Sequence, residues 1–133
     1  MKLEILTVCE SANIQGQALS IVAASDKIYS NQAPCIVPQF FIVFRIRFEL
    51  PEEGEHSVTF SIIDQDGNQV IQPLNKILMA KLPGNFSSCL NIGQIKFTDI
   101  LFPKFGEYSL DFLVDGNSLG SQPLYFAKTQ SSI

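Results

Sequence analysis

The feature that most constrains this chain is the segment from Phe40 to Leu50, in which every second residue is large and apolar. Successive side chains of a β-strand point to opposite faces of a sheet, so this spacing predicts a strand with one fully apolar face. That face comprises Phe40, Ile42, Phe44, Ile46, Phe48 and Leu50. The opposite face is apolar at its start and charged at its end, so we expect the start to be covered and the end to meet solvent. Its members are Phe41, Val43, Arg45, Arg47 and Glu49.

A hairpin is predicted directly after this strand. The turn residues Pro51–Gly54 precede a second alternating segment, His56–Ile63, which would return beside the first strand. Val58, Phe60 and Ile62 would then point inward, towards the same core.

A second hairpin is predicted near the C-terminus. The alternating segment Tyr108–Val114 is followed by Asp115-Gly116, a pair favoured in type I′ turns. The returning strand, Leu119–Phe126, contains Pro123. Proline lacks a backbone N–H, so we expect this strand at a sheet edge or with a bulge.

Shorter strands are predicted over Leu3–Cys9, Gln17–Asp26 and Phe86–Phe97. Val70–Leu82 is ambiguous, because its apolar residues fit a helical spacing and a poor edge strand alike. Many short strands with regular turns are typical of an all-β, immunoglobulin-like antiparallel β-sandwich, here of about seven to eight strands. A single short helix near residues 73–81 is the alternative for the ambiguous segment. We expect one domain over residues 1–128 and a flexible C-terminal tail over residues 129–133.

The composition excludes several classes of protein. Hydrophobic residues make up 46% of the chain and charged residues 17%, which excludes intrinsic disorder. The net charge is −4 and the basic residues are scattered, so we expect no nucleic-acid partner. The N-terminal segment carries Glu4 and Glu10, unlike a secretory signal, and the longest uncharged run, residues 28–44, contains two prolines, so we expect no membrane span. A cytoplasmic protein is the simplest interpretation.

Candidate catalytic and metal-binding residues are few. The single histidine, His56, would have to pair with Cys9, Cys35 or Cys89, and two of these lie in predicted strands, where buried inert thiols are common. We therefore predict no catalytic residues, no cofactor and no enzyme. The segment Asp64–Asn68 is interpreted as a turn. The alternative is a calcium site that pools Asp64, Asp66 and Asp99.

Two resemblances support the predicted fold. The run Gly106-Glu107-Tyr108 at the start of a strand resembles the tyrosine corner of immunoglobulin-like domains. More broadly, the chain resembles a family of uncharacterised bacterial single-domain β proteins, which implies a β-sandwich and brings no function. The residues that carry this resemblance are Glu4, Cys9-Glu10, Ile28-Tyr29, Val37–Phe40, Asp64–Asn68 and the hairpin from Gly106 to Gly116.

The leading functional hypothesis is a β-sandwich that binds a protein partner or a second copy of itself, through an apolar patch or an unpaired strand edge. Arg45 and Arg47 would belong to this surface, unless they only pair with Asp111 and Glu49. A sandwich that binds calcium, a sugar or a lipid is the second hypothesis, and a hydrolytic enzyme is the third. The predicted interaction surface comprises Phe41, Val43, Arg45, Arg47, Phe102 and Phe105, with Leu101 beside them.

Overall fold

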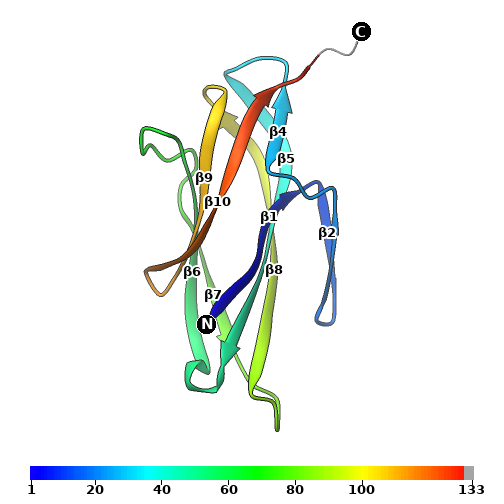
Figure 1. Cartoon of the computed structure of the whole chain (residues 1–133), viewed down its shortest axis with the longest axis vertical. Helices are drawn as coiled ribbons and strands as arrows, with labels where there is room; N and C mark the ends of the chain where they lie inside the picture. The colour runs from blue at the N-terminus through cyan, green and yellow to red at the C-terminus, as the bar shows by residue number, and fades with distance from the viewer. Residues whose placement is uncertain (131–133) are drawn as a thin grey trace.

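The computed structural model describes residues 1–130 and consists of two β-sheets packed face to face (Figure 1). Sheet one has the order β1 (Lys2–Cys9), β5 (Cys35–Glu49), β8 (Ser88–Phe102). Sheet two has the order β4 (Lys27–Ser30), β10 (Asn117–Lys128), β9 (Gly106–Val114), β6 (Gly54–Ile63), β7 (Leu74–Ala80). The predicted all-β sandwich is therefore confirmed.

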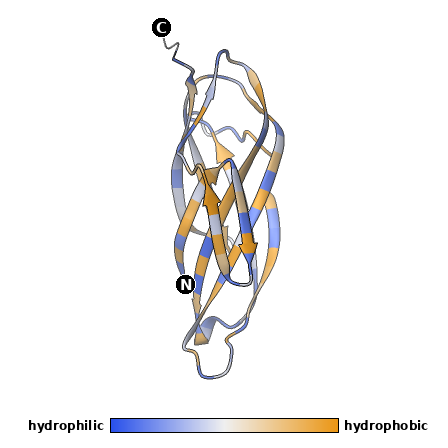
Figure 2. Cartoon of the chain, turned by 90° about the vertical axis from the view of Figure 1, so that its right-hand side faces the viewer, coloured by the Kyte–Doolittle hydropathy of each residue, from blue (hydrophilic) through white to orange (hydrophobic). Residues whose placement is uncertain are grey.

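A separate two-stranded hairpin, β2 (Ser11–Gln15) and β3 (Ala18–Val22), packs on the outside of sheet one. Strand β2 contacts β5 and β8, and Figure 2 shows the hairpin in front of that sheet. The half-buried face of the hairpin consists of Ala12, Ile14, Leu19 and Ile21. The strand predicted at Gln17–Asp26 is the shorter β3. Strands β2 and β4, which the sequence did not predict, raise the strand count in residues 1–130 to ten. Strand β4 pairs parallel with β10, so sheet two is mixed and not wholly antiparallel.

The core lies between the inner faces of β5, β6 and β9. The predicted apolar face of β5 is confirmed from Phe40 to Phe48, whose alternate side chains are each at most 4% exposed. Leu50 is the exception and is 60% exposed, because the strand ends at Glu49 and a short 3-10 turn, η1 (Leu50–Glu52), begins there. On the outer face Val43 is fully buried, while Arg45 and Arg47 remain partly exposed, as expected.

The hairpin predicted between β5 and β6 is wrong, because the two strands belong to different sheets. The η1 turn carries the chain across the sandwich, and β6 pairs with β7 and β9. The apolar faces of β5 and β6 consequently meet across the core, where the ring centroids of Phe44 and Phe60 lie 5.4 Å apart. Two strands that each bear one apolar face can bury it side by side in one sheet or face to face in two sheets. The alternation of apolar residues therefore does not distinguish these two arrangements.

The hairpin of β9 and β10 is confirmed. Asp115 and Gly116 both have positive φ, as a type I′ turn requires, and Val114 is opposite Asn117. Strand β4 pairs only with the end of β10, Tyr125–Lys128, so among residues 1–130 Pro123 has β9 on one side and no strand on the other. The expectation that the proline sits where the strand forms an edge is therefore met.

The tyrosine corner is also confirmed, and the alternative of a helix near residues 73–81 is wrong. The buried hydroxyl of Tyr108 donates a hydrogen bond to the carbonyl of Lys104 at 2.5 Å. Residues Leu74–Ala80 form strand β7, because pairing with β6 satisfies their backbone groups. In residues 1–130 no helix is long and apolar enough to cross a membrane.

Part of the predicted tail is attached to the fold. The backbone N–H of Thr129 donates a hydrogen bond to the carbonyl of Ser30 at 2.8 Å. The rest of the predicted tail, residues 131–133, lies outside the described residues.

Candidate functional site

The two arginines of the predicted surface are held by a single carboxylate. Arg45 Nε donates to Glu4 Oε1 at 3.0 Å, and Arg47 Nε donates to Glu4 Oε2 at 2.9 Å. Arg47 also donates from Nη1 to the hydroxyl of Ser88 at 2.9 Å. The register of β1 against β5 shifts between Leu3 and Ile5, so Glu4 occupies this irregularity. The hydrogen bond from Arg47, with the positive charge of both arginines, lowers the pKa of Glu4.

The partners predicted for these arginines are therefore wrong. Asp111 lies on β9 in sheet two and accepts a hydrogen bond from Ser109, whereas Glu49 forms no ion pair within the part of the chain that the structure describes. Sequence reasoning missed Glu4 because its contact with the arginines depends on which strand pairs with β5. Arg45 and Arg47 thus form a structural cluster on the outer face of sheet one.

The remaining residues of the predicted surface do not come together. Val43 and Phe102 belong to the predicted interaction surface, but both are fully buried and present no side-chain surface to a partner. Phe102 points inward because Asp99 has positive φ and shifts the alternation of β8, which turns Leu101 outward instead. Phe105 is half-buried and stacks on Phe126, with ring centroids 5.2 Å apart. Phe41 is half-buried on the outer face of β5.

The loop after β6 is a hydrogen-bonded turn. Asp64 Oδ1 accepts hydrogen bonds from the backbone N–H groups of Asp66 and Asn68, at 2.9 and 2.8 Å, which lowers the pKa of Asp64. Asp66 forms an ion pair with Lys104 at 2.9 Å. Within residues 1–130 no three His, Cys, Asp or Glu residues are grouped to hold a metal ion, so Asp64, Asp66 and Asp99 do not pool into the alternative calcium site.

His56 is engaged on both ring nitrogens. Nδ1 lies 2.7 Å from Asp115 Oδ2, and Nε2 lies 2.6 Å from the carbonyl oxygen of Glu52. The ring also stacks on Phe48, with centroids 4.7 Å apart. Both oxygens are acceptors, so this arrangement favours the protonated imidazolium, in which both ring nitrogens donate. The hydrogen bond to Glu52, supported by Asp115, accordingly raises the pKa of His56.

The three cysteines are free, and the two ring nitrogens of His56 contact Asp115 and Glu52 and not a cysteine thiol. Cys9 and Cys89 are buried, in agreement with the prediction of inert thiols in strands, and Cys35 is half-buried. Burial raises the pKa of Cys9, which keeps this thiol protonated and unreactive.

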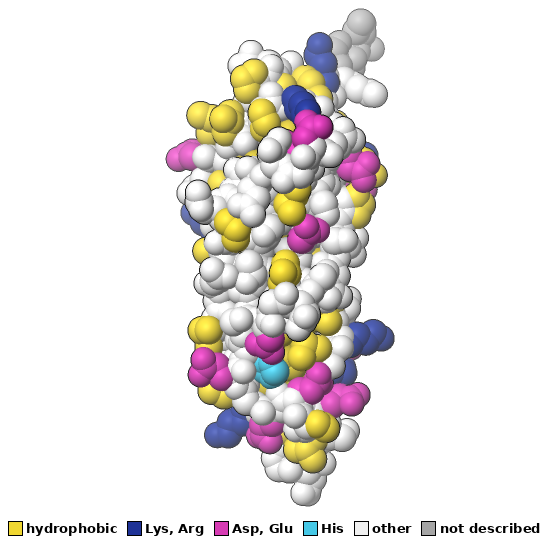
Figure 3. All heavy atoms as spheres, turned by 90° about the vertical axis from the view of Figure 1, so that its left-hand side faces the viewer, with side chains coloured by type: hydrophobic (Ala, Val, Ile, Leu, Met, Phe, Trp, Pro, Cys, Tyr) yellow, Lys and Arg dark blue, Asp and Glu magenta, His cyan; other side chains and the backbone are white. Residues whose placement is uncertain are grey.

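One end of the sandwich gathers exposed apolar side chains. Leu50 in η1, Ile77 and Met79 on the outer face of β7, and Phe86 in the β7–β8 loop are each at least 59% exposed. The sheet ends bring these segments together, since Gly54 is opposite Ala80 and Glu49 is opposite Ser88. Figure 3 shows hydrophobic and acidic side chains side by side around the histidine in this half of the molecule. We call these four residues, with Glu49, Glu53 and Glu55, the acidic pole.

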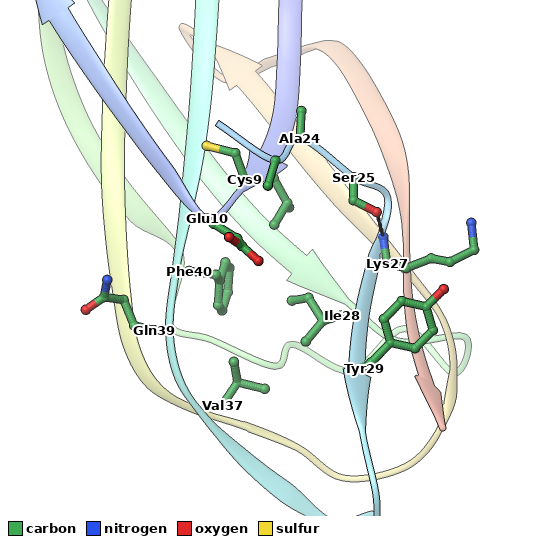
Figure 4. A pocket seen from close by; sticks show the side chains of 12 residues that line it. Cys9, Glu10, Ala24, Ser25, Lys27, Ile28, Tyr29, Val37, Gln39 and Phe40 are labelled. Carbon is green, nitrogen blue, oxygen red and sulfur yellow. Dashed lines mark hydrogen bonds between the residues drawn. The ribbon is translucent and has the colours of Figure 1, made fainter. Parts of the chain in front are cut away.

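A groove opens towards the other end of the sandwich, between β4 and β5. It has a volume of about 450 Å³ and is bordered by the end of β1 and the segment from Ala23 to Ser25. Ile28, Val37 and Phe40 line its floor, and the carboxylate of Glu10 points into it (Figure 4). Core side chains therefore reach solvent through this opening. Sequence reasoning did not find the groove, because β4 and β5 belong to different sheets and their separation is a tertiary property.

Comparison with known proteins places the chain in a family. No curated protein matches it. Among solved structures it resembles the alkylpurine DNA glycosylase AlkC of Pseudomonas fluorescens, whose structure contains DNA with an abasic site analog. The two share 14% sequence identity with a TM-score of 0.54, and the match covers 95% of this chain but 30% of the glycosylase. An immunoglobulin-like protein of Pseudomonas aeruginosa shows 8% identity and a TM-score of 0.42, over 94% of each chain. The family of unknown function DUF6941 matches residues 4–127, so the predicted resemblance to an uncharacterised family is confirmed and the chain belongs to that family.

Proposed function

We propose that this chain is a non-enzymatic module that binds another protein through the acidic pole. The observation that supports this proposal is the gathering of Leu50, Ile77, Met79 and Phe86 at one end, each more than half exposed. Large apolar side chains grouped on a surface are typical of contact sites, and an aromatic residue such as Phe86 is a common anchor within them.

The charge of the pole indicates what kind of partner fits it. Glu49, Glu53 and Glu55 are exposed, and none of them forms an ion pair within the described residues. The complementary surface is an apolar recess surrounded by lysine and arginine side chains. Association should therefore weaken as salt rises, because the exposed charges are screened.

Two alternatives are less well supported. A second copy of the chain would bring the same three carboxylates against one another, and like charges repel, so a different protein is favoured. DNA, which the glycosylase neighbour binds, would meet the same repulsion from a chain of net charge −4. The three free thiols suit a reducing compartment, so we propose that binding occurs in the cytoplasm.

In-cell photo-crosslinking tests the proposal. A photoreactive phenylalanine analogue replaces Phe86 in one variant and, as a matched control, the similarly exposed Leu101 on β8 in another. We expect a discrete adduct from position 86 that is absent from position 101. The captured protein, once purified, should bind wild type about tenfold more tightly than Phe86→Ala, a difference of ~1.4 kcal/mol.

Two results would count against the proposal. One is the same adducts from both positions. The other is a purified partner whose affinity depends neither on salt nor on Glu53→Gln and Glu55→Gln. An adduct of twice the chain mass would show self-association and replace the proposed partner with a second copy.

A further inference from the structure

The groove between β4 and β5 borders a strand edge that has no partner. Strand β1 pairs with β5 only from Phe41 to Arg47, after which the chain leaves the sheet at Cys9. Residues Cys35–Phe40 of β5 pair with β8 on one side, and within residues 1–130 no strand pairs with their other side. A free edge of this length spans about 20 Å and presents backbone carbonyl and N–H groups, except at Pro38, which has no N–H to donate.

The groove beside this edge is apolar at its floor. Val37 and Phe40 come from β5, and Ile28 comes from β4 across the opening (Figure 4). Val37 and Phe40 belong to the hydrophobic core, and their side chains also form part of the groove floor. A strand placed along the edge would direct alternate side chains onto this floor.

One charge faces the opening without a partner. The carboxylate of Glu10 points into the groove and forms no ion pair within the described part of the chain (Figure 4). The side chain of Lys27 extends away from Glu10 (Figure 4), and its ammonium group pairs with Asp26 at 2.8 Å. A positively charged side chain entering the groove would therefore meet a free carboxylate above an apolar floor.

We propose that this groove binds an extended peptide segment of another protein, which adds as a strand to Cys35–Phe40. The segment would carry apolar side chains at alternate positions and a lysine or arginine that pairs with Glu10. The unpaired edge selects a peptide backbone over a compact small molecule, because only an extended chain matches a row of backbone groups. The site is separate from the acidic pole and does not depend on it.

A random library of peptides of about seven residues, displayed on phage and selected on the full chain, tests the inference. Ala24 lines the groove and is exposed, so Ala24→Trp fills the groove, while Ala18→Trp places the same side chain on the exposed face of β3. We expect selected peptides to bind Ala24→Trp about tenfold more weakly and Ala18→Trp as tightly as wild type. Glu10→Gln should weaken the basic peptides roughly three- to fivefold, the contribution of an exposed ion pair.

Methylation of alternate backbone nitrogens in a selected peptide distinguishes two ways of binding. A peptide that adds as a strand needs its backbone N–H groups, whereas a peptide held only by apolar contacts does not. We expect the methylated peptide to lose binding, because the donors that pair with β5 are removed. The inference is overturned if no peptide is enriched over the Ala24→Trp variant, or if methylated and unmethylated peptides bind alike. Phe86→Ala should leave peptide binding unchanged, so failure at the groove and failure at the acidic pole are distinguishable.

Discussion

At the scale of single residues, Gly93 shows how closely the core is packed. A Cβ at this position would lie 2.3 Å from two ring carbons of Phe44, the residue opposite it on β5. The Phe44 ring is itself held between Phe60 and Phe112, with both centroid separations 5.4 Å. The ring therefore has little freedom to move away from an added methyl group.

Gly93→Ala should lower the free energy of unfolding by about 1–3 kcal/mol, the typical effect of overpacking a core. Urea unfolding monitored by circular dichroism measures this change. The control is Gln94→Ala, which alters an exposed side chain of the same strand and should change stability little. Equal unfolding midpoints for wild type and Gly93→Ala would contradict the close contact with Phe44.

His56 makes stability depend on pH at the same scale. Its pKa is raised in the fold by the carbonyl of Glu52 and the carboxylate of Asp115. A histidine with a raised pKa contributes stability that is fully present below its unfolded pKa of about 6.5 and is lost as pH rises through the folded value. The contribution should therefore decline between about pH 6.5 and the raised pKa.

His56→Phe keeps an aromatic ring to stack on Phe48 and removes both donors. We expect this variant to be less stable than wild type by about 1 kcal/mol at pH 6, and by less at pH 9. Urea unfolding of both proteins at the two pH values measures the difference. A gap that stays constant, or widens with pH, would show that the imidazolium does not supply this stability.

At the scale of elements, β7 is an edge strand of sheet two. The charge of Lys76 opposes the pairing of this edge with another chain. Lys76 is opposite Val58, a fully buried residue, so it projects from the inner face of sheet two at its edge. An inward-facing lysine on an edge strand prevents a second chain from adding there, because pairing would bury the charge. The exposed Ile77 beside it makes this protection necessary.

Lys76→Val should therefore increase self-association, with a dimerisation constant higher on the order of tenfold. Sedimentation velocity over a range of concentrations measures it. Lys81→Val removes the same charge just after the strand and should leave the oligomeric state unchanged. Similar behaviour of the two variants would show that net charge, and not the edge, controls association.

At the scale of the whole molecule, the two proposed contact sites lie towards opposite ends of the sandwich (Figure 1). The acidic pole is built from the connections after β5 and β7 and from the outer face of the edge strand β7, and the groove lies where β4 and β5 separate. Connections and open edges are the parts of a sandwich that can change without disturbing the core. A module of this kind could hold two protein segments at once, and crosslinking at Phe86 together with peptide binding at the groove would reveal it.

The sequence by itself determined those features that depend on neighbours along the chain. The alternation in Phe40–Phe48 predicted which side chains are buried, since strand geometry places every second residue on one face. Asp115-Gly116 predicted its hairpin because these two residues tolerate the positive φ that the turn requires. Tyr108 likewise bonds a carbonyl only four residues away.

Only the tertiary structure decided which strands lie side by side. Two features depend on contacts between distant segments: the crossing of the chain from β5 to β6 and the pairing of Glu4 with Arg45. The burial of Phe102 depends on one unusual backbone angle, the positive φ of Asp99. Each strand has an apolar face that several partners could cover, so the local pattern leaves pairing and crossing undetermined. Both proposed sites belong to this second class, because exposed ends and unpaired edges exist only after the strands have been arranged in space.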